Sequence, residues 1–121
     1  MSALAWLGVA LLGGAAAVAR FEVDRVVQQR IGGDFPIGTL VVNGVGSFAF
    51  GLLTGLGTAG DGAVLAGTAT LGSFTTFSTW VLETERLAED GEAGYSAANL
   101  LVSLACGLCA AGAGWALGAA L

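Results

Sequence analysis

The charged residues of this chain are confined to two clusters and one isolated position. One cluster runs from Arg20 to Asp34, the other runs from Glu83 to Glu92, and Asp61 stands alone. Four uncharged stretches remain, at residues 1–19, 35–60, 62–82 and 93–121. At a rise of about 1.5 Å per residue, each can cross a hydrocarbon core of roughly 30 Å as a helix, the first only just. This pattern predicts an all-α membrane protein with four transmembrane helices and leaves no room for a soluble domain.

Composition supports the same class. Only 11% of the residues are charged, 55% are hydrophobic, and the mean hydropathy is +0.83, which is too apolar for a soluble domain of 121 residues. The first apolar run lacks the basic flank of a signal peptide, so we expect it to be retained as a helix. We predict one domain over residues 1–121, with helices at about 2–19, 36–57, 62–82 and 95–119.

The arginines predict the orientation of the chain. All four lie in the connections that follow the first and third predicted helices, and the other side of the membrane has none. The positive-inside rule places these connections in the cytoplasm and both termini outside. We therefore predict a multi-pass protein of the cytoplasmic membrane.

The third uncharged stretch is polar at its centre. Residues 72–80 read GSFTTFSTW and combine a glycine, several hydroxyl side chains and three aromatic rings. Non-helical backbone at membrane depth survives only where it is buried in protein or lines a hydrated path, because each unpaired N–H or C=O in hydrocarbon costs several kcal/mol. The sequence therefore predicts a third helix that is broken at the membrane midplane, in a protein that moves or binds a small ion.

Polar and small residues form stripes on two other predicted helices. Thr39, Asn43 and Ser47 follow one another at intervals of four residues, as do Asn99 and Ser103, so each set shares one helix face. These faces should point into protein. For Asn43 alone, a hydrogen bond to a neighbouring helix and a role in an ion pathway are equally plausible interpretations. A row of small residues predicts close helix packing: Gly44, Ser47, Gly51 and Gly55.

Cys106 and Cys109 form a CxxC pair in an uncharged stretch, and the chain has no histidine. Nothing near these thiols would lower their pKa or complete a metal site. We interpret them as small packing residues.

Together these features resemble a known family. The strings GTLVVNGVGSFAFGLLTG at residues 38–55 and GSFTTFSTWVLETE at residues 72–85 are similar to the Fluc, or CrcB-type, bacterial fluoride channels, as are Gly13-Gly14 and Arg20. The likeness covers essentially the whole chain. It implies an antiparallel dimer of four-helix subunits, two fluoride-conducting pores, and a structural sodium ion at the centre of the dimer interface.

The resemblance also implies roles for individual residues. The main-chain carbonyls of Gly72 and Thr75 from each subunit would bind the sodium ion. Phe77 and Trp80 would line the pore, where the positive edge of an aromatic ring can face an anion. Arg20 would lie near the aqueous vestibule and concentrate anions. Donors that replace the water around fluoride are expected from Asn43, Thr39, Ser78, Thr79 and Ser103.

The chain departs from the family pattern in its aromatic residues. Trp80 stands in place of a phenylalanine and adds an N–H donor. Asn99 stands where the family often has a tyrosine, four residues before Ser103. Glu83 matches a family glutamate, and a solvated or arginine-paired loop charge is an equally good interpretation of it.

The sequence also constrains the partners and the competing functions. A small multidrug-type exporter needs a titratable carboxylate within the membrane, and the four uncharged stretches contain none. A non-transporting assembly subunit would use the polar stripes only as helix contacts. We expect no enzyme activity and no nucleic-acid partner. A chain that inserts in both orientations should have almost no arginine bias between the two sides of the membrane, but here the arginines are distributed four against none. The expected partner is therefore either a second copy of the chain, which inserts in both orientations despite this bias, or an oppositely oriented paralogue.

Overall fold

The computed structural model describes residues 1–121, and all of its secondary structure is helical. The elements are α1 (Ala3–Ile31), α2 (Ile37–Gly55), α3 (Gly60–Ala63), the π-helix η1 (Val64–Leu71), α4 (Gly72–Phe74), α5 (Ser78–Glu89) and α6 (Ala93–Ala120). Three of them, α1, α2 and α6, are long and apolar enough to cross a membrane. The predicted all-α class is confirmed, and these helices are those expected of a multi-pass membrane protein.

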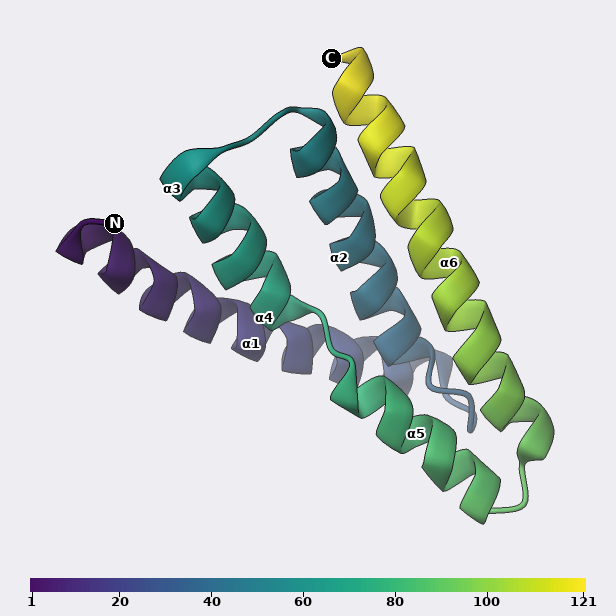
Figure 1. The fold of residues 1–121 in the computed structure, drawn as a ribbon. Helices are drawn as coiled ribbons and strands as arrows, with labels where there is room; N and C mark the ends of the chain where they lie inside the picture. The colour runs from purple at the N-terminus through teal and green to yellow at the C-terminus, as the bar shows by residue number, and fades with distance from the viewer.

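The chain runs back and forth between two ends of the molecule (Figure 1). Both termini and the α2–α3 connection lie toward one end, and the α1–α2 and α5–α6 connections lie toward the other. At this second end Asp34, from the α1–α2 connection, is hydrogen-bonded to Glu92, from the α5–α6 connection. This hydrogen bond raises the pKa of the Glu92 carboxyl above its ordinary value. The two arginine-bearing parts of the chain therefore meet at the same end, as the predicted topology requires.

The predicted second and fourth helices agree with α2 and α6 to within two residues. The first predicted helix was expected to stop near residue 19, where the charged residues begin. Instead α1 continues through them to Ile31. Its charged part is stabilised by an ion pair between Glu22 and Arg25, one turn apart. The helix stops at Gly32, whose φ of 72° suits glycine and whose N–H donates to the carbonyl of Gln28.

The helices α2 and α6 lie side by side and run in the same direction (Figure 1). Their backbones touch at glycines on both helices: Gly51, Gly55, Gly114 and Gly118. A Cβ at Gly114 would overlap the carbonyl oxygen of Phe48. The predicted packing role of Gly51 and Gly55 is therefore confirmed, whereas that of Gly44 is not seen within the subunit, because a Cβ there would meet nothing within 4 Å.

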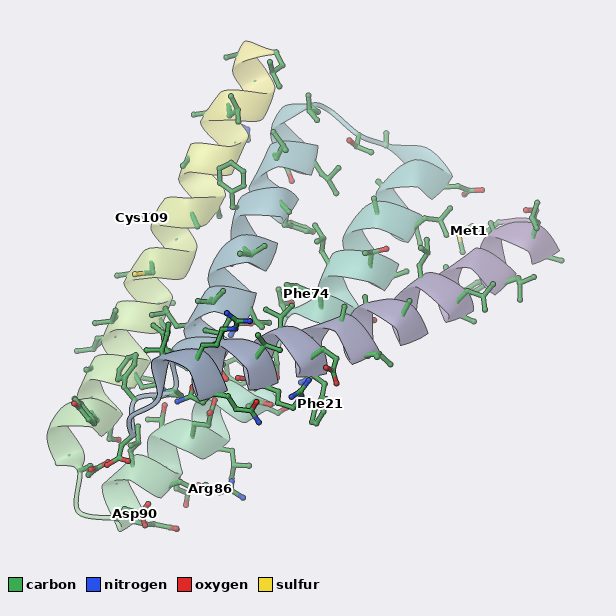
Figure 2. The ribbon with its side chains drawn as sticks, turned by 180° about the vertical axis from the view of Figure 1, so that it is seen from behind. Met1, Phe21, Phe74, Arg86, Asp90 and Cys109 are labelled. Atoms are coloured by element: carbon green, nitrogen blue, oxygen red, sulfur yellow. The ribbon has the colours of Figure 1, made fainter.

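Seen from behind, α1 crosses the rest of the molecule at a steep angle (Figure 2). Where it passes the segment around Phe74, Gly13 permits a close approach, since a Cβ there would lie 3.2 Å from Ser73 Oγ. Cys109 lies on α6, away from this crossing (Figure 2), and both cysteines are free and exposed. Their predicted role as packing residues is therefore not seen within the subunit.

The segment from Gly60 to Glu89 consists of short helical pieces instead of one helix over residues 62–82. In η1 the hydroxyl of Thr70 donates to the carbonyl of Leu65, five residues earlier, at 2.7 Å. Helical structure stops at Phe74 and resumes at Ser78, and Thr75 between them is extended with a ψ of 162°. No single piece of this segment is long enough to cross a membrane by itself.

Candidate functional site

The gap between α4 and α5 is held by the side chain of Asn43 on α2. Asn43 Nδ2 donates to the carbonyl of Thr76 at 2.8 Å, and the N–H of Thr76 donates to Asn43 Oδ1 at 2.8 Å. One amide side chain thus satisfies both main-chain groups of Thr76. Because an amide nitrogen carries two hydrogens, Asn43 keeps one N–H that Thr76 does not use. Gly46, one turn further along α2, makes room for the gap, since a Cβ there would overlap the Thr75 side chain.

Two carbonyl oxygens at the gap lose the partner that a continuous helix would give them. In such a helix the N–H of Thr76 would donate to Gly72, and the N–H of Thr79 would donate to Thr75. Here Thr76 donates to Asn43, and Thr79 donates to Thr76 Oγ1 at 3.2 Å. The oxygens of Gly72 and Thr75 are therefore left for other partners, and such oxygens are the ligands that hard cations prefer.

A cavity of about 350 Å³ lies beside the gap, between α2, α5 and α6. Five of the predicted site residues line it: Asn43, Thr75, Phe77, Trp80 and Ser103. A second cavity of about 330 Å³ shares Asn43, Ser47 and Thr75 with the first and continues past Gly67 on η1. Together the two cavities follow the gap on the side of Asn43, and no charged residue lines either of them.

The two aromatic residues of the cavity contact each other edge to face. The ring centroids of Phe77 and Trp80 are 5.5 Å apart, and the ring planes meet at 75°. Trp80 Nε1 donates to the carbonyl oxygen of Asn99 at 2.9 Å. The indole N–H, which the sequence suggested as an extra donor for an anion, is thus bonded within the protein, and Trp80 contributes its ring to the cavity.

The remaining predicted site residues lie outside both cavities. Thr39 is buried in the first turn of α2, and its hydroxyl donates to Glu83 Oε1 at 2.5 Å, so Glu83 has a buried partner there. Ser78 is exposed at the start of α5, and Thr79 is half-buried beside it. Arg20 is half-buried on α1, within the helix and not at its end.

Sequence reasoning missed Thr76 and Gly46, which shape the gap. The available signal for Thr76 was its place three residues before Thr79, which is the spacing of a helix cap. Gly46 had no signal that set it apart from the other glycines of α2.

The family model described as "CrcB-like protein, Camphor Resistance (CrcB)" matches residues 7–115 of this chain. The chain belongs to the CrcB family. The resemblance found in the sequence is thereby confirmed, and it covers the α2 residue Asn43, the gap and the cavity.

Several relatives within the CrcB family carry names that state an activity. The "Fluoride-specific ion channel FluC 2" of Mycobacterium tuberculosis strain H37Rv is 51% identical over 106 residues, which cover 88% of this chain and 84% of the relative. The protein of the same name from Haloarcula marismortui is 51% identical over 83 residues, or 69% of this chain and 70% of the relative. The "Fluoride-specific ion channel FluC" of Opitutus terrae is 43% identical over 107 residues, with 82% and 80% covered.

Proposed function

We propose that this chain forms a fluoride-selective channel of the cytoplasmic membrane, through which fluoride leaves the cell passively. The CrcB relatives named as fluoride-specific ion channels support this proposal. The observation that carries it is the uncharged cavity on which Asn43, Phe77, Trp80 and Ser103 converge. A multidrug-type exporter is disfavoured, because this cavity offers no carboxylate for proton coupling.

The cavity suits a small, tightly hydrated anion. Asn43 retains a free amide N–H, and the positive edges of the Phe77 and Trp80 rings add a weak attraction for negative charge. Such neutral donors replace hydration water without the permanent charge that would trap the ion. The cavity can therefore bind fluoride strongly enough to admit it and weakly enough to release it.

We further propose that the segment from Gly60 to Glu89 makes the third of four membrane crossings, with its gap near the midplane. In an antiparallel dimer two such gaps face each other across a two-fold axis. The Gly72 and Thr75 carbonyls of both subunits then supply four oxygens to one structural sodium ion. The exposure of Phe77, which is 72% in the single subunit, supports a partner that covers the gap.

The decisive experiment is ion efflux from liposomes that contain the purified protein. We expect rapid fluoride efflux and little chloride efflux. Loss of the ring edge in Phe77→Leu should slow fluoride efflux by about fivefold, since aromatic contacts contribute about 1 kcal/mol. Phe48→Leu changes a phenylalanine of α2 that lines neither cavity, so it should conduct like the unsubstituted protein.

Absence of fluoride efflux from the unsubstituted protein would overturn the proposed function and favour the assembly subunit. Equal slowing by Phe77→Leu and Phe48→Leu would remove Phe77 from the pathway.

The orientation of the subunits is tested separately. We expect the chain expressed alone to form a homodimer, so a tag at its N-terminus should be detected from both sides of the membrane. Detection from one side only would mean that the arginines impose a single orientation. The antiparallel partner would then be an oppositely oriented paralogue.

A further inference from the structure

Asn99 is the centre of a hydrogen-bond cluster that joins α5 to α6. It is fully buried, at 0% exposed. Its Nδ2 donates to Thr84 Oγ1 at 2.8 Å and to the carbonyl oxygen of Trp80 at 3.3 Å. Its Oδ1 accepts from Ser103 Oγ at 3.3 Å. The Asn99 side chain therefore has a partner for each of its donors and for its acceptor.

Trp80 is tied to the same place from its own side. Its ring N–H donates to the main-chain carbonyl of Asn99 at 2.9 Å, and its own carbonyl accepts from Thr84 Oγ1 at 2.8 Å. The indole is thus anchored at its N–H and contacts Phe77 edge to face. Two contacts of fixed geometry leave the ring little rotational freedom.

Only part of the cluster lines the cavity. Trp80 and Ser103 line the cavity, whereas Asn99 and Thr84 do not. Every side-chain hydrogen bond of Asn99 therefore joins it either to a cavity residue or to Thr84, whose hydroxyl is bonded to the cavity residue Trp80. This arrangement is typical of a residue that acts through its neighbours.

We propose that Asn99 is a positioning residue for the ion pathway, which holds the Trp80 ring and the Ser103 hydroxyl in the orientation that selects fluoride. This inference rests on the proposed function. It also explains why Trp80 and Asn99, the two departures from the family pattern, occur together, since each depends on the other. A phenylalanine at position 80 could not donate to the carbonyl of Asn99, and a tyrosine at the fully buried position 99 would exceed the space that asparagine fills.

The orientation of the ring can be followed apart from ion flux. The substitutions Trp6→Phe and Trp115→Phe change two exposed side chains and leave Trp80 as the only tryptophan. In this background Asn99→Ala should increase the quenching of Trp80 fluorescence by acrylamide and lower its anisotropy, because the indole becomes mobile and wetter. The fluoride-over-chloride flux ratio should fall by about tenfold, which corresponds to the loss of one to two hydrogen bonds.

Ser96→Ala is the matched control. Ser96 Oγ donates to the carbonyl of Thr84 at 2.7 Å, so it also joins α6 to α5, but its side chain has no hydrogen bond with Trp80 or Asn99. This variant should leave the fluorescence and the flux ratio unchanged. Thr84→Val keeps the shape of its side chain and removes the hydroxyl that accepts from Asn99 and donates to the carbonyl of Trp80. It should reproduce a smaller part of the Asn99→Ala effect, and it keeps the test decisive if Asn99→Ala does not fold.

The double variant Trp80→Phe/Asn99→Ala tests whether the two residues form a unit. Its loss of selectivity should be smaller than the sum of the two single losses, because each single substitution already disrupts the same anchoring of the ring. Unchanged Trp80 fluorescence in Asn99→Ala, or an equal change in Ser96→Ala, would overturn the positioning role. A protein without fluoride flux would overturn the proposed function while the fluorescence still reports on the anchoring of Trp80.

Discussion

The variant Gly114→Ala is expected to lose at least about 3 kcal/mol of folding stability, the upper part of the usual range for overpacking. Its new Cβ would overlap the carbonyl oxygen of Phe48 and lie 2.9 Å from the N atom of Leu52. These are main-chain atoms that cannot rotate away, so α2 and α6 would have to separate. In lipid, helix association depends on close van der Waals contact of this kind. Equilibrium unfolding of the purified protein in mixed detergent micelles, followed by circular dichroism, measures the loss.

Gly112→Ala is the control on the same helix. A Cβ at Gly112 meets nothing within 4 Å. Alanine is favoured over glycine in a helix interior by up to about 1 kcal/mol, so this variant should be as stable as the parent or slightly more stable. If both variants lose the same stability, the contact between α2 and α6 is not what Gly114 provides.

The helices that the sequence predicted best are those whose boundaries coincide with helix breakers. The second predicted helix begins beside Pro36, and α2 begins at Ile37. The first helix was predicted too short because charged residues mark the end of an apolar stretch, not the end of hydrogen bonding. Its true end is set by Gly32 and Gly33, both with positive φ. The π-helix η1 had no signal, since its main-chain bonds join residues five apart, as from the Gly72 N–H to the Gly67 carbonyl, a spacing that no side-chain pattern marks.

For the candidate site, residue spacing predicted faces but not partners. The interval of four residues placed Thr39 and Asn43 on one face of α2. In the structure their hydrogen-bond partners differ, since Thr39 donates to Glu83 whereas Asn43 is bonded to the main chain of Thr76. The contact between Trp80 and Asn99 joins residues 19 apart, so it depends on how α5 packs against α6. Helical periodicity carries no information about such pairings.

Of the two interpretations of Asn43 that the sequence left open, the structure shows the hydrogen bonds to a neighbouring segment, and the role in an ion pathway is a proposal. Asn43 joins α2 to the third segment, and the same bonds keep that segment from closing into a helix. The competition concerns a single hydrogen, the N–H of Thr76, which can donate either to Asn43 or to the carbonyl of Gly72. In the proposed sodium site, Asn43 would therefore decide whether the Gly72 oxygen stays available to the cation.

Asn43→Leu is accordingly expected to abolish fluoride efflux. Leucine has nearly the same size, but it leaves the N–H and C=O of Thr76 without partners, at a cost of about 1–3 kcal/mol for each group. The chain can recover part of this cost if Thr76 donates to Gly72 instead, which closes the gap and withdraws one proposed sodium ligand. Liposome efflux measures the loss of conduction, and the dependence of protein stability on sodium concentration should disappear with it.

Thr54→Val provides the comparison for Asn43→Leu on α2. It removes the hydrogen bond from the Thr54 hydroxyl to the Phe50 carbonyl in the last turn of α2, which is not bonded to Thr76. Efflux and sodium dependence should therefore persist. Asn43→Asp separates the two bonds of Asn43, because an ionised carboxylate can accept from the Thr76 N–H but cannot donate to its carbonyl. If the gap depends on the N–H of Thr76, sodium-dependent stability should survive in Asn43→Asp and vanish in Asn43→Leu. Fluoride efflux from Asn43→Leu at the unsubstituted rate would show that the gap does not need Asn43.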